Sequence, residues 1–99
     1  MYQFNISIFI EPQIQNEFET YFNENILNGI SNKSENPLRL FHIESHQEPD
    51  SKGYSLQFYH PALNIEKNQQ EIIFLIIEKL NEKFINKYLY FTSLLKAIE

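Results

Sequence analysis

The sequence predicts an α+β fold of ferredoxin-like topology, βαββαβ, with a four-stranded antiparallel sheet and two helices on one face. Three observations predict it: strict apolar alternation at Tyr2–Ile10, apolar residues at helical spacing in two later segments, and turn residues that separate six elements in this order. A right-handed crossover followed by a hairpin arranges such elements as a split βαβ fold. With 99 residues, the chain is expected to form a single domain over residues 1–99.

Strands are predicted at four places. The first, Tyr2–Ile10, alternates between the two faces of a half-buried sheet. Proline residues then bracket two further strands, Leu38–Glu44 and Tyr54–His60, because proline has no N–H for a ladder. Residues 47–53 carry turn chemistry and join these two strands as a hairpin. The last strand is expected at Lys87–Leu95.

Two helices are predicted, at 12–28 and at 64–86. In the first, Phe18, Phe22 and Ile26 recur every four residues and form one apolar stripe. The second contains Glu71–Ile77, a segment that is also compatible with a strand, but its polar flanks continue a helical pattern. Its expected core stripe is Ile73, Ile76, Ile77, Leu80 and Phe84.

Composition excludes several classes of function. Apolar residues make up 42% of the chain, which excludes intrinsic disorder. The absence of cysteine excludes disulfides, cysteine-ligated zinc or iron–sulfur centres and thiol catalysis. The net charge is −5 and the eight basic residues are scattered, so we expect neither nucleic acid nor a membrane surface as a partner. With no signal peptide and no apolar run long enough for a membrane span, a cytoplasmic location is expected.

Several segments resemble a known family of small proteins, the domain of unknown function DUF4286. The similarity covers nearly the whole chain, and Tyr54–Phe58 (Tyr-Ser-Leu-Gln-Phe) is its most distinctive segment. The other segments are Tyr2–Ile8, the aromatic residues Phe18, Tyr21 and Phe22, Leu38–Leu40, and Lys87–Phe91. The resemblance implies a ferredoxin-like fold related to the dimeric α/β-barrel proteins, in which two sheets face each other across a dimer. It implies no activity.

This sequence also departs from the family pattern at two places. A His-Ile-Pro that is typical of the end of the first helix is Asn25-Ile26-Leu27 here, and a position that is often basic in the second strand is His42. Roles that the family residues play at these positions are therefore not carried over.

The face of the sheet away from the helices is the candidate functional surface. If Phe4, Ile6 and Ile8 face the helices, strand parity places polar and aromatic residues from all four strands on the open face. The candidate ligand or interface residues are Asn5, Arg39, Phe41, Gln57, Tyr59 and Tyr90. Large apolar side chains gathered on one face are typical of an interface or a groove. The surface is interpreted first as a homodimer interface, with a ligand cavity enclosed by the dimer and a different protein partner as alternatives.

The three histidines do not predict a metal site. His42, Glu44 and His46 share a strand face, but a rise of about 3.3 Å per residue separates His42 from His46 by about 13 Å. Adjacent pairs offer only two ligands, fewer than a zinc site uses. His60 is interpreted as a strand-end residue beside Pro61. We expect no bound metal and no cofactor.

The sequence contains no arrangement that is typical of catalysis. It has no glycine-rich phosphate loop, because its only glycines are Gly29 and Gly53, and no histidine shares the open face with Ser7 or Ser55. The fold also occurs in RNA-recognition domains, but where their third strand carries its signature this chain has Lys52-Gly53-Tyr54-Ser55-Leu56, which departs from it at Ser55 and Leu56, and the chain is acidic. The sequence favours a homodimeric binding or interaction module with an unspecified small-molecule ligand. The alternative is a small enzyme of the dimeric α/β-barrel type with a cavity on the sheet face.

Overall fold

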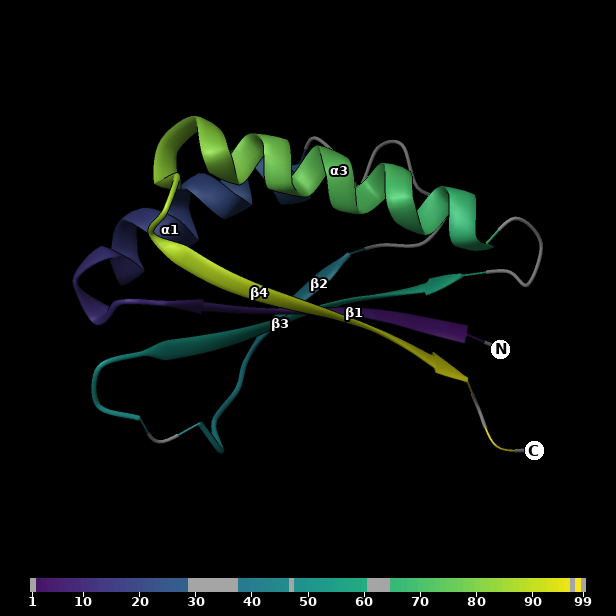
Figure 1. Cartoon of the computed structure of the whole chain (residues 1–99). Coiled ribbons are helices and arrows are strands. Elements are labelled where there is room, and N and C mark those ends of the chain that lie inside the picture. The colour runs from purple at the N-terminus through teal and green to yellow at the C-terminus, as the bar shows by residue number, and fades with distance from the viewer. Residues whose placement is uncertain (1, 29–37, 47, 61–64, 97, 99) are drawn as a thin grey trace.

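The computed structural model describes residues 2–28, 38–46, 48–60, 65–96 and 98. Its elements follow the predicted βαββαβ order, and the helices lie on one side of the sheet (Figure 1). They are β1 (Tyr2–Ile10), the 3₁₀ turn η1 (Pro12–Ile14), α1 (Gln15–Tyr21), the π-helix η2 (Phe22–Leu27), β2 (Arg39–His42), β3 (Lys52–His60), α3 (Ile65–Phe84) and β4 (Tyr88–Lys96).

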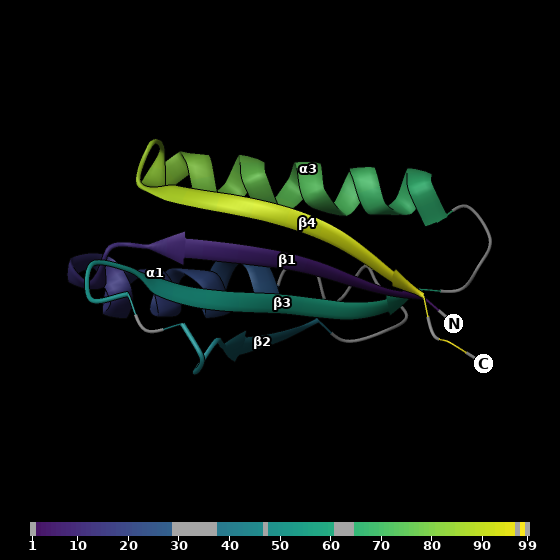
Figure 2. The same ribbon diagram turned by 60° about the horizontal axis from the view of Figure 1, so that its bottom comes forward.

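The four strands form one antiparallel sheet in the order β2-β3-β1-β4. Strands β1 and β3 are central, and β2 and β4 form the two edges (Figure 2). The central strand β1 pairs along its entire length with β3 on one side and with β4 on the other. This arrangement confirms the predicted ferredoxin-like topology.

The core lies between the sheet and the helices. Phe4, Ile6, Ile8 and Ile10 of β1 are all buried there, as their alternation predicts. Phe18 links the layers, because its ring centroid lies 5.0 Å from that of Tyr54 on β3 and 5.8 Å from that of Phe84 on α3. One aromatic side chain of the first helix therefore contacts both the sheet and the second helix.

The first helix changes pitch along its length. It begins as a 3₁₀ turn, continues as an α-helix and ends as a π-helix. In an α-helix, four residues overshoot a full turn by about 40°, whereas the wider π turn, with its i→i+5 bonds, undershoots it. The change of pitch keeps Phe18, Phe22 and Ile26 on one face, where all three are fully buried.

Several element boundaries differ from the prediction, each by one or two residues. β2 ends at His42 rather than Glu44, because a turn follows in which the His46 N–H donates to the Ile43 carbonyl at 3.1 Å. β3 begins two residues early, at Lys52, and β4 runs one residue further, to Lys96. Gly29 and the rest of the connection from the first helix to β2, residues 29–37, lie outside the described residues.

Helix α3 resolves the ambiguity of the segment 71–77 in favour of a helix. Ile76, Leu80 and Phe84 are buried, and Ile73 and Ile77 pack against the core with partial exposure. None of the helices in the described ranges combines the length and the apolar content that crossing a membrane requires. Asn86, with φ of 63°, adopts the left-handed conformation that ends a helix, and turns the chain into β4.

We expect Phe18→Ala to lower the free energy of unfolding by about 3–5 kcal/mol, because it leaves a cavity between three buried rings. Ile85→Ala is the control, since Ile85 is 61% exposed and its truncation is expected to cost about 0.5 kcal/mol or less. Urea denaturation followed by circular dichroism measures both. Equal midpoints for the two variants would contradict the packing described here.

Candidate functional site on the open face of the sheet

A chain of side-chain hydrogen bonds crosses the open face along the two central strands. Gln3 Nε2 donates to Gln57 Oε1, Gln57 Nε2 donates to Ser55 Oγ at 3.0 Å, Ser55 Oγ donates to Asn5 Oδ1, and Asn5 Nδ2 donates to Ser7 Oγ at 3.1 Å. These five residues, Gln3, Asn5, Ser7, Ser55 and Gln57, are called the amide ladder below. Each of them is partly buried.

The pairing of β1 with β3 builds this ladder. Asn5 lies directly opposite Gln57, and Ser7 lies opposite Ser55, so amide and hydroxyl groups alternate within reach of one another. The intervening residues of both strands, such as Ile6 and Leu56, point into the core and are fully buried. The alternation that builds the core on one face therefore also builds the ladder on the other.

Strand β2 adds a cation and an aromatic ring beside the ladder. Arg39 lies opposite Gln57, and Phe41 lies opposite Ser55, so both share the open face, as predicted. Phe41 is 45% exposed, and Arg39 is exposed as well. Tyr59, another predicted residue, pairs with Gln3 through its backbone.

Strand β4 adds apolar side chains on the other side of the ladder. Leu89, Phe91 and Leu95 lie opposite Phe9, Ser7 and Gln3 of β1, and all three are exposed. The open face thus has a polar centre, whose side chains bond to one another, between an apolar margin on β4 and a margin on β2 that carries Phe41 beside Arg39.

Tyr90 is not part of this face, and its predicted placement was wrong. It lies opposite Ile8, whose side chain is buried under the helices, so Tyr90 points to the helix side of the sheet. The alternation of β4 does not reveal this, because apolar or aromatic residues occupy both of its faces. The turn at Asn86 and the register with β1 decide which set faces which side.

The loop before β3 covers one end of the open face. The Phe9 ring lies 5.0 Å from His46 and 6.1 Å from Phe91, measured between ring centroids. Its ring edge rests against Gly53, where a Cβ atom would approach Phe9 Cε1 to 3.0 Å. His46 Nε2 and Ser51 Oγ are 2.9 Å apart, so the imidazole is held within the loop.

A second polar group lies on the helix side, and the sequence did not reveal it. His42 Nε2 is 3.0 Å from Glu19 Oε1 of α1, and the His42 ring lies 4.9 Å from that of Tyr54. Glu19 is one turn from Gln15 and follows the buried Phe18, which would place it near the sheet, but nothing in the pattern connects it with His42. Among the residues that the structure describes, no three His, Asp or Glu side chains gather as a metal site would require.

The Tyr54 hydroxyl is buried, and within the described part of the chain no group bonds to it at hydrogen-bond distance. The pKa of Tyr54 is raised to about 12, mainly by burial and in addition by the Glu19 carboxylate, while the polar side chain of Gln15 offsets a part of this rise. Tyr54 therefore stays neutral over the physiological range and serves as a core residue that carries one polar atom.

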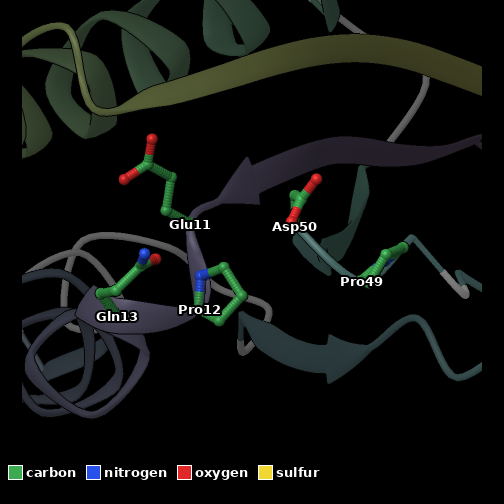
Figure 3. Close-up of a pocket in the computed structure, with 5 residues that line it drawn as sticks. All are labelled: Glu11, Pro12, Gln13, Pro49 and Asp50. Carbon is green, nitrogen blue, oxygen red and sulfur yellow. The ribbon is translucent and has the colours of Figure 1, made fainter.

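A shallow pocket of about 430 Å³ lies at the end of the sheet, away from the amide ladder. Figure 3 shows that Glu11, Pro12 and Gln13 line it from the segment after β1, and Pro49 and Asp50 from the loop before β3. Its two carboxylates come from different loops. A pair of acids in an open hollow is not sufficient to define a catalytic or a metal site.

The topology and the sheet register define the protein as an α+β domain of the ferredoxin-like class. Residues 1–98 match the domain of unknown function DUF4286, and the chain belongs to this family. No protein of curated function matches the sequence.

Several solved structures are similar to this chain at low sequence identity. The de novo designed protein Ferredog-Diesel is similar, with a TM-score of 0.55 and 14% identity over 95% of this chain and 84% of that one. The CPII protein of Thiomonas intermedia K12, solved with ADP, AMP and acetate, has a TM-score of 0.48 and 10% identity over 99% and 90% of the two chains. A putative PII-like signalling protein of Thermus thermophilus has a TM-score of 0.47 and 8% identity over 96% and 87%.

We expect Asn5→Ala to lower the free energy of unfolding by about 1–3 kcal/mol, because the Ser55 hydroxyl loses its acceptor and the Ser7 hydroxyl loses its donor. Asn16→Ala, at an exposed position of α1, is the matched control and should stay within about 0.5 kcal/mol of the parent chain. Chemical denaturation measures both. A ladder that contributes nothing would leave the two variants alike.

We expect Tyr54→Phe to be neutral or stabilising near pH 7, because it removes a buried hydroxyl that has no partner among the described residues. The folded-state pKa of Tyr54 is raised above the ordinary value of 10 to about 12, so the folded state holds the phenol proton more tightly than the unfolded state does. The free energy of unfolding is therefore unaffected by this group below pH 10 and falls as the pH rises toward 12. Between pH 9 and 11 the parent chain should lose about 1.4 kcal/mol more stability than Tyr54→Phe. Parallel losses in urea titrations at the two pH values would show that Tyr54 ionises normally.

Proposed function

We propose that this protein is a homodimeric interaction module whose two copies pack through the open faces of their sheets. The observation that carries the proposal is the amide ladder between the margins on β2 and β4. The ladder occupies the middle of the face, and Phe41 lies on one margin with Leu89, Phe91 and Leu95 on the other.

The ladder makes the face suitable for burial. An amide or hydroxyl that loses water without gaining a partner costs about 1–3 kcal/mol. In the ladder, each side chain already bonds to a neighbour. Covering the face therefore leaves few polar groups without a hydrogen-bond partner. The apolar side chains of the two margins lose water on contact and supply the driving force, at roughly 25 cal/mol for each Å² buried.

The charge of the protein supports a protein partner over an anionic polymer. The chain carries −5 at neutral pH, and Arg39 is the one basic residue that parity and register place beside the ladder in the described part of the sheet. Neither nucleic acid nor an anionic membrane finds the basic surface that it needs. A small molecule enclosed between the two faces would have to hydrogen-bond to the amide, hydroxyl and arginine groups.

We expect the chain to sediment as a species larger than its monomer mass of 11.9 kDa at micromolar concentration. Phe41→Ser should raise the dissociation constant at least tenfold, because it removes an exposed ring from the β2 margin. Asn16→Ser, at an exposed position of α1 away from the open face, is the control. Sedimentation velocity over a concentration series measures all three chains. Equal association of Phe41→Ser and the parent would remove the open face as the interface.

A further inference from the structure

Most of the exposed large apolar side chains in the described residues belong to β4 or to the segments on either side of it. In the described residues, every large exposed apolar side chain except Phe41 lies between positions 74 and 98. These are Phe74, Ile85, Leu89, Tyr90, Phe91, Leu94, Leu95 and Ile98. A monomeric protein of this size rarely leaves so many such residues together in contact with water.

Strand β4 is the centre of this surface, and it is apolar on both of its faces. Tyr90 and Leu94 lie opposite Ile8 and Phe4 and point to the helix side of the sheet. Leu89, Phe91 and Leu95 point to the open side. β4 has β1 as its single neighbour in the described sheet, and its other edge faces outward, as Figure 2 shows.

The two edges of the sheet differ in protection. Natural edge strands avoid pairing by being short, by carrying charges in mid-strand, or by including proline or a bulge. β2 has four residues and carries Arg39 and His42. β4 has nine residues, contains no proline and no acidic residue, and carries its single charge at the last position, Lys96.

Helix α3 extends the apolar surface above β4. Its Asn81 Oδ1 accepts a hydrogen bond from Tyr88 Oη of β4 at 2.7 Å, whereas its Lys79 carbonyl accepts one from Tyr21 Oη, which belongs to the first helix. Phe74 precedes Asn81 by seven residues, or about two turns, so it shares the side of α3 that lies toward β4. Phe74 is 69% exposed there.

We propose that β4 is a second interaction surface, at which it pairs antiparallel with β4 of another copy and joins two sheets into one of eight strands. The partner is a copy of this chain because an antiparallel pair of identical strands is self-complementary about a two-fold axis. Opposite residues must point to the same face, so any such register centres on one residue that faces its own copy. Full overlap of Tyr88–Lys96 centres the register on Thr92.

This register places apolar side chains opposite each other in two of its pairs. Leu89 lies opposite Leu95 of the second copy on the open side, and Tyr90 lies opposite Leu94 on the helix side. Phe91 lies opposite Ser93, and at each end Lys96 lies beside the ring of Tyr88, where a cation–π contact is favourable. No two like charges oppose each other directly.

The exposed side chains supply a part of the area that a stable interface needs. Phe74, Tyr90 and Phe91 are 69%, 42% and 61% exposed. With about 200 Å² for an aromatic side chain, these three offer at most roughly 350 Å² per copy, and the leucines of β4 and the backbone edge add to this. Specific interfaces bury about 800 Å² per partner.

Cross-linking tests the register, since the chain has no native cysteine. Thr92→Cys should form a disulfide-linked dimer on mild oxidation, because residue 92 faces its own copy at a Cα separation of about 4.5–5.5 Å. Ser93→Cys, one residue out of register, and Glu24→Cys, on the exposed surface of η2, are the controls. We expect Thr92→Cys to cross-link at least tenfold faster than either control. Equal rates for all three would overturn the proposal.

Introducing a single charge into each surface distinguishes association through β4 from association through the open face. Leu94→Lys places a charge in the middle of the β4 edge, on the helix side, and Phe41→Lys changes the open face alone. Sedimentation velocity of the full chain reports the mass of each. If the parent is a tetramer that uses both surfaces, each variant should leave a dimer; if the parent is a dimer through β4, only Leu94→Lys should dissociate it.

Loss of association in Phe41→Lys alone, with Leu94→Lys unchanged, would overturn the β4 interface and support the open face. Loss in Leu94→Lys alone would support the β4 interface and overturn the open-face dimer. Circular dichroism confirms that each variant is folded. If Leu94→Lys is not folded, the cross-linking rates of Thr92→Cys and its controls decide the question.

Discussion

The pairing of β1 with strands on both sides is the constraint on which the rest of the structure depends. Because β1 bonds along its whole length to β3 and to β4, its alternation imposes a face on both neighbours. The helices pack against the buried residues of β1, which are Phe4, Ile6, Ile8 and Ile10, and the residues between them lie on the open face. Shifting this register by one residue would move the core residues into water and the amides into the core.

The first helix meets this constraint by changing its own geometry. A uniform α-helix with apolar residues every four positions would rotate its stripe away from the sheet. The π segment at Phe22–Leu27 reverses that drift, so Phe18, Phe22 and Ile26 all remain buried. The side chain of Asn25 supports the segment by donating to the Tyr21 carbonyl at 3.1 Å. Core packing thus outweighs the preference of the backbone for α-helical bonds.

The two faces of the sheet differ in how their polar groups are satisfied. On the open face, the amides and hydroxyls bond to one another. The surface is therefore polar in composition, yet removing it from water leaves few polar groups without a partner. On the helix side, His42 and Glu19 pair near the edge, and the Tyr54 hydroxyl is buried without a partner among the described residues. Apolar exposure follows a third pattern, because it is concentrated at β4. Association through β4 and association through the open face are therefore physically separate possibilities for one chain.

The sequence by itself determined the order of the elements, the topology, the parity of β1 and β3 and most of the core. These follow from local periodicity, which survives whatever the neighbouring elements do. The placement of Asn5, Gln57, Arg39 and Phe41 on one face was predictable for the same reason.

Only the tertiary structure decided the parity of β4, the pitch of the first helix and the contact between His42 and Glu19. In β4 both alternating sets contain large apolar or aromatic side chains, so periodicity favours neither face, and the register with β1 places Tyr90 on the helix side of the sheet. Glu19 and His42 belong to different elements, and their meeting depends on how the helix packs on the sheet.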